Sequence, residues 1–283
     1  MNNYIEVKCR DGYILKGILY PSTAPIKKSE PIIISPATGI VQQFYQPFAV
    51  WLTQQGYDVL TFDFRGIGAS LNGALKDSKA SIQDWGLLDL PAVIDTALKK
   101  TGASQVNIIG HSAGGQLVGL VENHQQVKQL ISIAGSTGHI KGLKGRTKLL
   151  APLMFNLLFP LSSAFKGYGA AKVIGMGENL PKGVARQWAQ FCSRPGYVMN
   201  AVGKTINKHY HEQVCCPITA IAATDDEIAT EQNIDALLKL YPLAPTKKLI
   251  IQPKHYGHRS IGHMLMFRPS HQNLWPLIAG QLN

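Results

Sequence analysis

The residues of this chain with the clearest chemical potential are a serine and the small residues around it. Residues 110–115 read Gly-His-Ser-Ala-Gly-Gly and follow an apolar run directly. A serine between glycines at this spacing is typical of a tight strand-to-helix turn that lifts the hydroxyl above the sheet edge. We expect the helix to span 114–123 and to point its free N–H groups at the site. Ser112 is the predicted nucleophile.

Short apolar runs alternate with helical segments along the chain, which predicts crossover connections and a mostly parallel sheet. Buried strands are expected at 31–35, 57–62, 106–109, 130–134, 217–223 and 248–252. Helices are expected at 43–55, 81–100, 231–240 and 270–282. Residues 4–9 and 14–20 predict a hairpin through Asp11-Gly12.

The alternation stops between residues 135 and 214, which hold no clear strand and are rich in Leu, Phe, Gly, Pro and Lys. We therefore expect a core domain of residues 1–136 and 215–283. A helical cap of residues 137–214 would interrupt it and lie over the edge of the sheet.

Several motifs resemble the α/β-hydrolase superfamily, especially its capped serine hydrolases akin to monoacylglycerol lipases and serine aminopeptidases. The matching stretches are Asp-Gly-Tyr at 11–13, Gly-Tyr at 56–57, Asp-Phe-Arg-Gly-Ile-Gly-Ala-Ser at 63–70 and the G-x-S-x-G pattern at 110–114. The match covers roughly 1–136 and 215–283, and the insertion matches only loosely. The resemblance implies a mostly parallel central sheet flanked by helices. The motifs taken together resemble bacterial proteins known mainly as predicted hydrolases.

In that fold the chain order of a catalytic triad is Ser, then Asp or Glu, then His. Residues 224–228 read Thr-Asp-Asp-Glu-Ile after an expected strand, where the acid belongs. The family's spacing favours Asp226 as the acid, with Asp225 as the alternative. Carboxylates here could also simply begin the next helix.

Three histidines follow the last expected strand, His255, His258 and His263. The resemblance places the catalytic base in a Gly-His context with an aromatic residue one turn later, which matches His263. His258 also follows a glycine, but its neighbours are typical of a solvated loop. His111 is expected to pack the turn beside the nucleophile.

An oxyanion hole needs two backbone N–H donors. One is expected from Ala113. The other should come from the loop after residues 31–35, where the family often carries His-Gly and this chain reads Pro-Ala-Thr-Gly at 36–39. Thr38 best matches the donor position, although the departure puts the second donor in doubt.

The expected cap contains a strongly apolar stretch at 149–165, interrupted by Pro152 and Pro160. Two compatible interpretations are a buried helical pair packed on the core and the lining of an apolar acyl pocket, with Phe155 and Phe159 as pocket residues. A dense basic run precedes the stretch, formed by Lys141, Lys144, Arg146 and Lys148. It is either a solvated face or a contact with an anionic membrane surface.

The net charge of +11 fits an anionic partner or simply a basic soluble protein, and no nucleic-acid-binding module is recognisable. The four cysteines show no metal-ligand or disulfide spacing. The amino terminus lacks a secretory apolar run, and no stretch reaches about 18 uninterrupted apolar residues. We expect a cytoplasmic protein without metal or organic cofactor.

Together these features predict hydrolysis of a small-molecule carboxylic ester, with thioester and amide substrates left open, through an acyl-serine intermediate. The substrate is expected to carry an apolar acyl chain. Two alternatives are an acyltransferase that uses the same triad and a non-catalytic binding protein on the same fold. The sequence does not indicate the oligomeric state.

Overall fold

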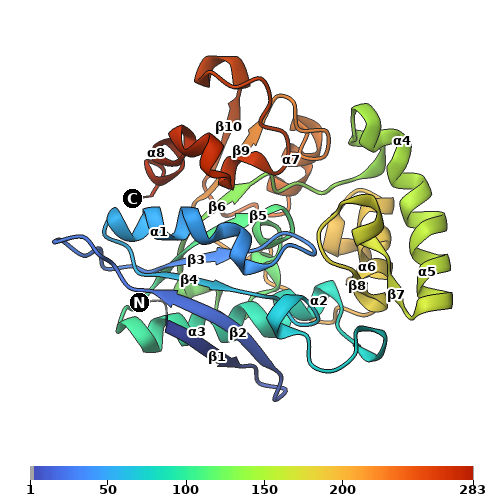
Figure 1. Ribbon diagram of the computed structural model, residues 1–283, viewed down its shortest axis with the longest axis horizontal. Helices are drawn as coiled ribbons and strands as arrows, with labels where there is room; N and C mark the ends of the chain where they lie inside the picture. Colours follow the sequence, from blue (N-terminus) through green and yellow to red (C-terminus); the bar gives the residue numbers. More distant parts are fainter. Residues whose placement is uncertain (1–2, 283) are drawn as a thin grey trace.

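A computed structural model describes residues 3–282, so residues 1, 2 and 283 at the ends of the expected core domain lie outside the described residues. Its centre is an eight-stranded sheet (Figure 1). In spatial order the strands are β1 (Asn3–Lys8), β2 (Ile14–Tyr20), β4 (Val59–Phe62), β3 (Ile32–Ser35), β5 (Val106–His111), β6 (Val127–Ile133), β9 (Ile218–Ala223) and β10 (Thr246–Ile251). Only the pairs β1–β2 and β2–β4 are antiparallel, and the other pairs are parallel.

Helices cover both faces of the sheet. On one face α1 (Gln46–Gln54) and α8 (Trp275–Ala279) pack on Ile32 and Ile34, and on the other face α3 (Leu90–Thr101) packs on the same core as Ile33. Neighbouring residues of one strand thus enter opposite cores, as the pleat of a strand requires. This explains why β3 is wholly apolar, and the predicted mostly parallel sheet is confirmed.

The expected helices exist with modified ends. The segment 43–55 begins with a 3₁₀ turn (Gln42–Tyr45) before α1, and 81–100 divides into α2 (Ile82–Asp84), a π-helical turn (Trp85–Asp89) and α3. The helix α7 (Glu231–Leu238) lies where expected, and 270–282 forms a 3₁₀ turn (Pro269–Leu274) and α8. Prolines near the starts of α1, α3 and α8 lack the N–H that a continuous helix would use.

The expected helix at 114–123 is wrong. Among the described residues this segment forms only 3₁₀ turns, Ser112–Gly115 and Val118–Leu120. Glycines at 114, 115 and 119 each weaken a helix by about 1 kcal/mol relative to alanine. The ring of His211 also fills the space that a Cβ on Gly119 would need. Tertiary packing therefore replaces the helix here.

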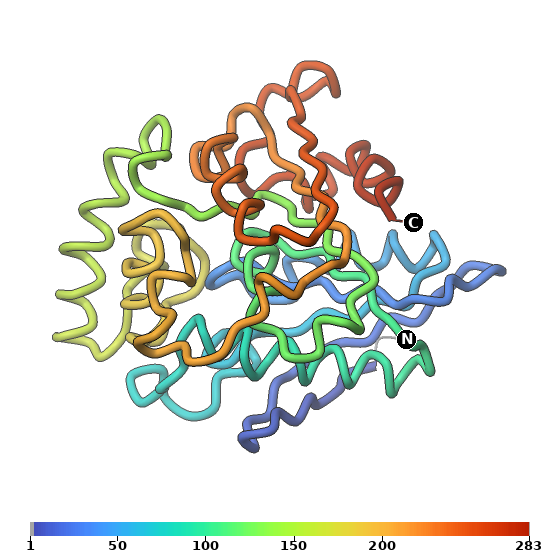
Figure 2. Tube along the Cα trace, turned by 180° about the vertical axis from the view of Figure 1, so that it is seen from behind, coloured from blue at the N-terminus to red at the C-terminus, as the bar shows by residue number. Residues whose placement is uncertain are grey.

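Between β6 and β9 the chain forms α4 (Gly145–Leu153), a π-helical turn (Met154–Leu158), α5 (Phe159–Lys166), the two-residue strands β7 (Tyr168–Gly169) and β8 (Leu180–Pro181), and α6 (Lys182–Ser193). Figures 1 and 2 show these elements gathered at one side of the sheet. We refer to them as the cap.

The expected buried helical pair is wrong, because α4, the π-helical turn and α5 form one continuous helix, Gly145–Lys166. Pro152 lies inside α4 and Pro160 at the start of α5, and the wider π turn lies between them. The helix also has the length and hydropathy to cross a membrane, which we did not expect from the sequence, and only 28% of its most apolar window is buried.

Candidate active site

The turn at the end of β5 holds Ser112 in a strained conformation. Its φ is 48°, and only two other non-glycine residues between 3 and 282 have a positive φ. A Cβ on Gly110 would overlap the backbone of Gly114, and a Cβ on Gly114 would overlap the carbonyl of Ser35. Strain of this kind persists only where the surroundings enforce it, and it is common at functional sites. The predicted tight turn at Ser112 is confirmed.

The imidazole of His263 lies against the carboxylate of Asp226, with Nδ1 2.8 Å from Oδ2 and 3.1 Å from Oδ1. Asp226 Oδ1 also accepts hydrogen bonds from the N–H groups of Ile228 and Ala229. Burial raises the pKa of Asp226, but nearby His263 and the hydrogen bonds outweigh it and hold that pKa below its ordinary value. An ionised Asp226 accepts from Nδ1–H, which leaves Nε2 of His263 free to take a proton.

The neighbouring carboxylate of Asp225 has a different role. It accepts hydrogen bonds from the hydroxyl of Ser260 (2.6 Å) and from the N–H groups of Ile261 and Gly262 (3.0 Å each). Burial raises its pKa, and these hydrogen bonds lower it to a net value below the ordinary one. Asp225 therefore holds the loop that carries His263. Of the two acids that the sequence left open, Asp226 is the one that contacts the imidazole.

The other two histidines lie outside this arrangement. His258 is partly buried, bonds the side chain of Asn273 and stacks on His271 at 3.9 Å between ring centroids. His255 is exposed. Neither lines the cavity that contains Ser112.

Ser112 and His263 line one cavity of about 180 Å³. Its wall is largely apolar and includes Ile40, Met176, Trp188, Tyr197, Ile228 and Met264. Within the described residues no hydrogen bond joins the hydroxyl of Ser112 to His263. Such bonds are often long in free enzymes and shorten when a substrate binds.

Of the two expected oxyanion donors, one is the next residue after Ser112 and the other lines the same cavity as Ser112. Ala113 follows Ser112 in the turn, and Thr38 lines the cavity from the loop after β3. The N–H of Thr38 donates to no other residue between 3 and 282, so it is available to a ligand. The N–H of the preceding Ala37 instead donates to the hydroxyl of Tyr45.

A buried hydrogen-bond chain, not anticipated from the sequence, links the three parts of the site. The N–H of Ala37 donates to the Tyr45 hydroxyl (2.9 Å), which lies 2.8 Å from Nδ1 of His111, and Nε2 of His111 lies 2.9 Å from the carbonyl oxygen of His263. A carbonyl can only accept, so Nε2 carries the proton and Nδ1 accepts from Tyr45. Burial lowers the pKa of His111 to about 3, which keeps this ring neutral.

This chain connects the loop after β3, the turn at Ser112 and the backbone of His263. The sequence predicts only a packing role for His111. It carries no signal for Tyr45, which stands 66 residues away and is brought to His111 by the fold.

The prediction that Phe155 and Phe159 line the substrate pocket is wrong for the cavity that contains Ser112. Both rings are buried and line a separate cavity of about 500 Å³. They pack against that indole at centroid distances of 5.6 and 6.0 Å. The helix turns these rings inward onto α6, so Trp188 lines the cavity that contains Ser112 and the two phenylalanines pack against Trp188.

Glu227, next to Asp226, joins the loop after β9 to the cap. Its carboxylate accepts hydrogen bonds from the N–H groups of Arg146 and Thr147 and from the Thr147 hydroxyl. These donors form the first turn of α4, and they hold the pKa of Glu227 below its ordinary value.

As for metals, no group of three or more His, Cys, Asp or Glu side chains suited to an ion occurs between residues 3 and 282.

The sheet order, the strained serine turn and the Asp226–His263 pair define an α/β-hydrolase-fold protein. Residues 36–151 match a family described as alpha/beta hydrolase fold. The resemblance to the α/β-hydrolase superfamily indicated by the sequence motifs is thus confirmed.

Among curated proteins the chain is similar to Lipase lipl-1 of Caenorhabditis elegans, with 30% identity over 62% of this chain and 47% of that protein. It is also similar to a tear acid lipase-like protein of Mesocricetus auratus, with 25% identity over 71% and 56% of the two chains. The chain thus spans about half the length of these relatives.

Solved structures show the same fold over nearly the whole chain. A soluble variant of monoglyceride lipase from Saccharomyces cerevisiae superposes with a TM-score of 0.67 at 15% identity, over 99% of this chain and 97% of that one. The esterase Pf2001 of Pyrococcus furiosus gives a TM-score of 0.64 at 16% identity, over 100% and 90%.

Proposed function

We propose that this protein is a serine hydrolase that cleaves carboxylic esters through an acyl-serine intermediate. The observation that carries the proposal is the cavity in which a strained Ser112 and a His263 paired with buried Asp226 meet. A serine hydroxyl is a weak nucleophile on its own, and a histidine base oriented by a carboxylate is the common way to activate it. The similarity to lipases in sequence supports the same chemistry.

In the proposed mechanism Nε2 of His263 takes the proton of Ser112 as the hydroxyl oxygen attacks the ester carbonyl carbon. The oxyanion that forms accepts hydrogen bonds from the N–H groups of Ala113 and Thr38. The C–O bond to the alcohol then breaks, and His263 returns the proton to the leaving oxygen. Water, deprotonated by His263, attacks the acyl-serine carbonyl carbon; the bond to the Ser112 oxygen then breaks, the acid is released, and His263 returns the proton to Ser112. Asp226 stabilises the imidazolium in both halves.

The apolar walls of the cavity favour a substrate whose acyl part is hydrocarbon. Met176, Trp188 and Ile228 offer no charge to a polar acyl group, and such surfaces bind chains by excluding water. The residues of the wall thus support the apolar acyl chain expected from the sequence, with Trp188 in place of Phe155 and Phe159. Cytoplasmic location and the boundaries of the cap stay predictions.

The test is a panel of p-nitrophenyl esters of increasing chain length, with thioester and amide analogues alongside. Ser112→Ala and His263→Ala should each lower kcat by about a millionfold, the loss for a fully engaged triad. His255→Ala and His258→Ala are the controls and should keep activity, since both side chains lie outside the cavity. A dead His258→Ala, or an active Ser112→Ala, would contradict the assignment. Product partitioning with an added alcohol separates hydrolysis from acyl transfer.

A further inference from the structure

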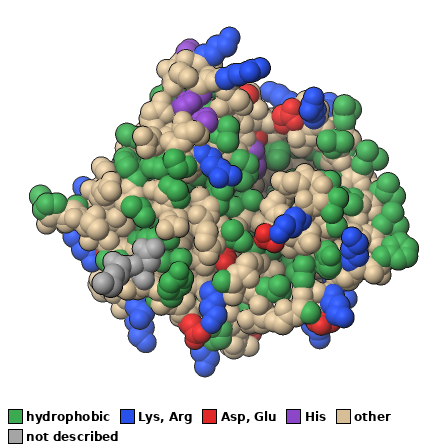
Figure 3. Space-filling model, in the orientation of Figure 1, with side chains coloured by type: hydrophobic (Ala, Val, Ile, Leu, Met, Phe, Trp, Pro, Cys, Tyr) green, Lys and Arg blue, Asp and Glu red, His purple; other side chains and the backbone are tan. Residues whose placement is uncertain are grey.

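The outer face of the cap is unusually apolar for a surface. Of the twelve large hydrophobic side chains exposed in the described part of the chain, eight lie in the cap. We call them the apolar face: Leu149, Leu150, Leu153, Leu157, Leu161, Phe165, Val173 and Ile174. Leu149 is 72% exposed and Phe165 is 85% exposed. Figure 3 shows apolar side chains gathered along the edge formed by α4 and α5. A contiguous exposed patch of this kind marks a docking site.

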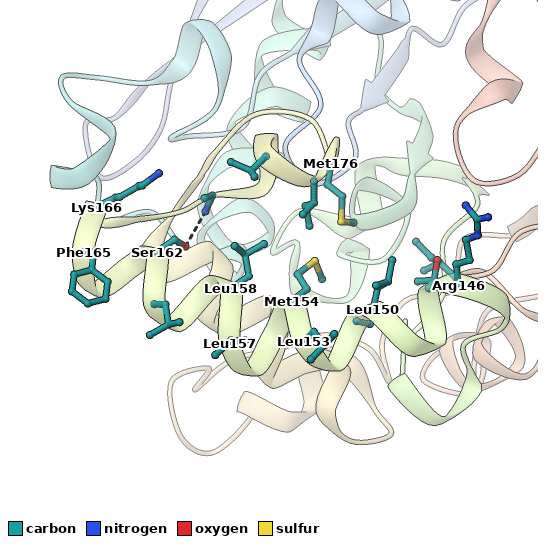
Figure 4. A pocket seen from close by; sticks show the side chains of 17 residues that line it. Arg146, Leu150, Leu153, Met154, Leu157, Leu158, Ser162, Phe165, Lys166 and Met176 are labelled. Atoms are coloured by element: carbon teal, nitrogen blue, oxygen red, sulfur yellow. Dashed lines mark hydrogen bonds between the residues drawn. The ribbon is translucent and has the colours of Figure 1, made fainter.

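All residues of the apolar face except Leu149 line a groove of about 770 Å³ between the helix Gly145–Lys166 and the segment 170–176. Met154 of the helix faces Met176 across it (Figure 4). Met176 and Ile228 line both this groove and the cavity that contains Ser112. The groove therefore adjoins the catalytic cavity at these two side chains.

Positive charge surrounds the apolar face. Residues 137–177 contain no Asp or Glu. The cations of this region are Lys141, Lys144, Arg146, Lys148, Lys166 and Lys172. Lys172 pairs with Glu178, and Glu227 is engaged by the first turn of α4. These cations form a basic fringe around the apolar face, and the net positive charge of this fringe complements an anionic surface.

The helix fits a position in the plane of a bilayer surface. Its inner side, including Phe155 and Phe159, is buried in the cap, so only the outer leucines are free to enter lipid. At 1.5 Å per residue its 22 residues extend about 33 Å along such a plane. An amphipathic helix with leucines on one side and flanking lysines is the usual interfacial arrangement.

A second copy of the chain fits less well. A twofold contact brings the same patch onto itself, so the basic fringes of two chains, each with a net charge of +11, would meet. We propose that the apolar face docks on the surface of an anionic lipid bilayer, and that the groove passes an acyl chain from the bilayer to Ser112. The docking is inferred from the charge and exposure of the apolar face alone, whereas the passage of an acyl chain through the groove rests on the proposed function.

The experiment measures co-sedimentation of the full chain with vesicles of phosphatidylcholine alone or mixed with phosphatidylglycerol. The wild type should bind the mixed vesicles much more tightly. Leu153→Ser/Leu157→Ser should weaken binding at least tenfold. Lys144→Gln/Lys148→Gln should weaken it about fivefold per lysine, with less effect at high salt. The matched controls are Leu243→Ser, at a leucine 64% exposed outside the face, and Lys99→Gln/Lys100→Gln at the exposed end of α3.

The proposal would be overturned if the wild type bound both kinds of vesicle equally well. It would also be overturned if the leucine and lysine variants of the apolar face bound as tightly as their controls. Reversible dimers that Leu153→Ser/Leu157→Ser abolishes, without vesicle binding, would assign the face to a second copy and overturn it as well. Thermal unfolding shows whether the Leu153→Ser/Leu157→Ser variant is folded. If it is not, the binding of the Lys144→Gln/Lys148→Gln variant decides the test. Hydrolysis of soluble p-nitrophenyl acetate by the wild type reports on the proposed function separately, because that substrate needs no membrane.

Discussion

Removal of one hydroxyl, in Tyr45→Phe, should break the chain that aligns the active site. That hydroxyl donates to Nδ1 of His111 and accepts from the N–H of Ala37, and all three residues are buried. Phenylalanine keeps the ring, which packs edge-on against Phe267 at 4.9 Å. The change leaves one buried acceptor and one buried donor unpaired, at about 1–3 kcal/mol each. The free energy of unfolding should therefore fall by about 2–6 kcal/mol.

Urea unfolding measures that loss, and steady-state kinetics measure its effect on the site. We expect kcat for a soluble ester to fall about tenfold with little change in KM, since the oxyanion loop and the base lose their common anchor. The control is Tyr20→Phe, because the buried hydroxyl of Tyr20 has no hydrogen-bond partner among the described residues. That control should change stability by less than about 0.5 kcal/mol. If Tyr45→Phe is as mild as Tyr20→Phe, the chain does not align the site.

Three further experiments, with five variants in all, should separate the roles of individual residues. Asp226→Asn should lower kcat by about 10⁴-fold because it disturbs the tautomer of His263. Asp225→Asn should mainly lower stability, because it disturbs the loop contacts of Ser260, Ile261 and Gly262. Equal losses of kcat in the two variants would contradict the assignment. Trp188→Ala should lower the ratio of kcat/KM for octanoate esters to that for acetate esters by fivefold or more, because each methylene that is no longer shielded from water costs about 0.8 kcal/mol. Phe155→Ser should lower the melting temperature and leave this ratio unchanged. Burial lowers the pKa of His211 to about 4 from the ordinary 6.5. Between these two pH values the unfolded chain binds a proton on this side chain and the folded chain does not, so stability declines as pH falls from about 6.5 to 4. His211→Phe should reduce the stability lost between pH 8 and pH 5 by about 2 kcal/mol, measured by urea unfolding at both pH values, and an unchanged loss would refute the burial argument.

Much of the fold follows from local sequence. All eight strands of the sheet lie within a few residues of their expected positions, because most are short apolar runs and β1 and β2 flank the turn at Asp11-Gly12. The turn at Ser112 is equally local, since Gly110 and Gly114 are required by backbone contacts within that turn and with Ser35. The pairing of His263 with Asp226 could be expected only from the family's order of residues.

The remaining features depend on contacts between distant residues. The side of the cap helix that carries Phe155 could not be oriented without α6, whose Trp188 it contacts. The helix expected after Ser112 is absent from the described residues, where His211 packs on Gly119. An apolar stretch likewise does not reveal from its composition whether it faces the core or solvent.

The most direct test of the central claim is the mass of the protein after reaction with a fluorophosphonate, followed by peptide mapping. Such reagents phosphonylate a serine that a neighbouring base activates. We predict one adduct per chain, on Ser112, and none on the Ser112→Ala variant. His263→Ala should slow labelling strongly, and His258→Ala should not. An unlabelled wild-type protein, or an adduct on any other residue, would contradict the account of Ser112 as an activated nucleophile.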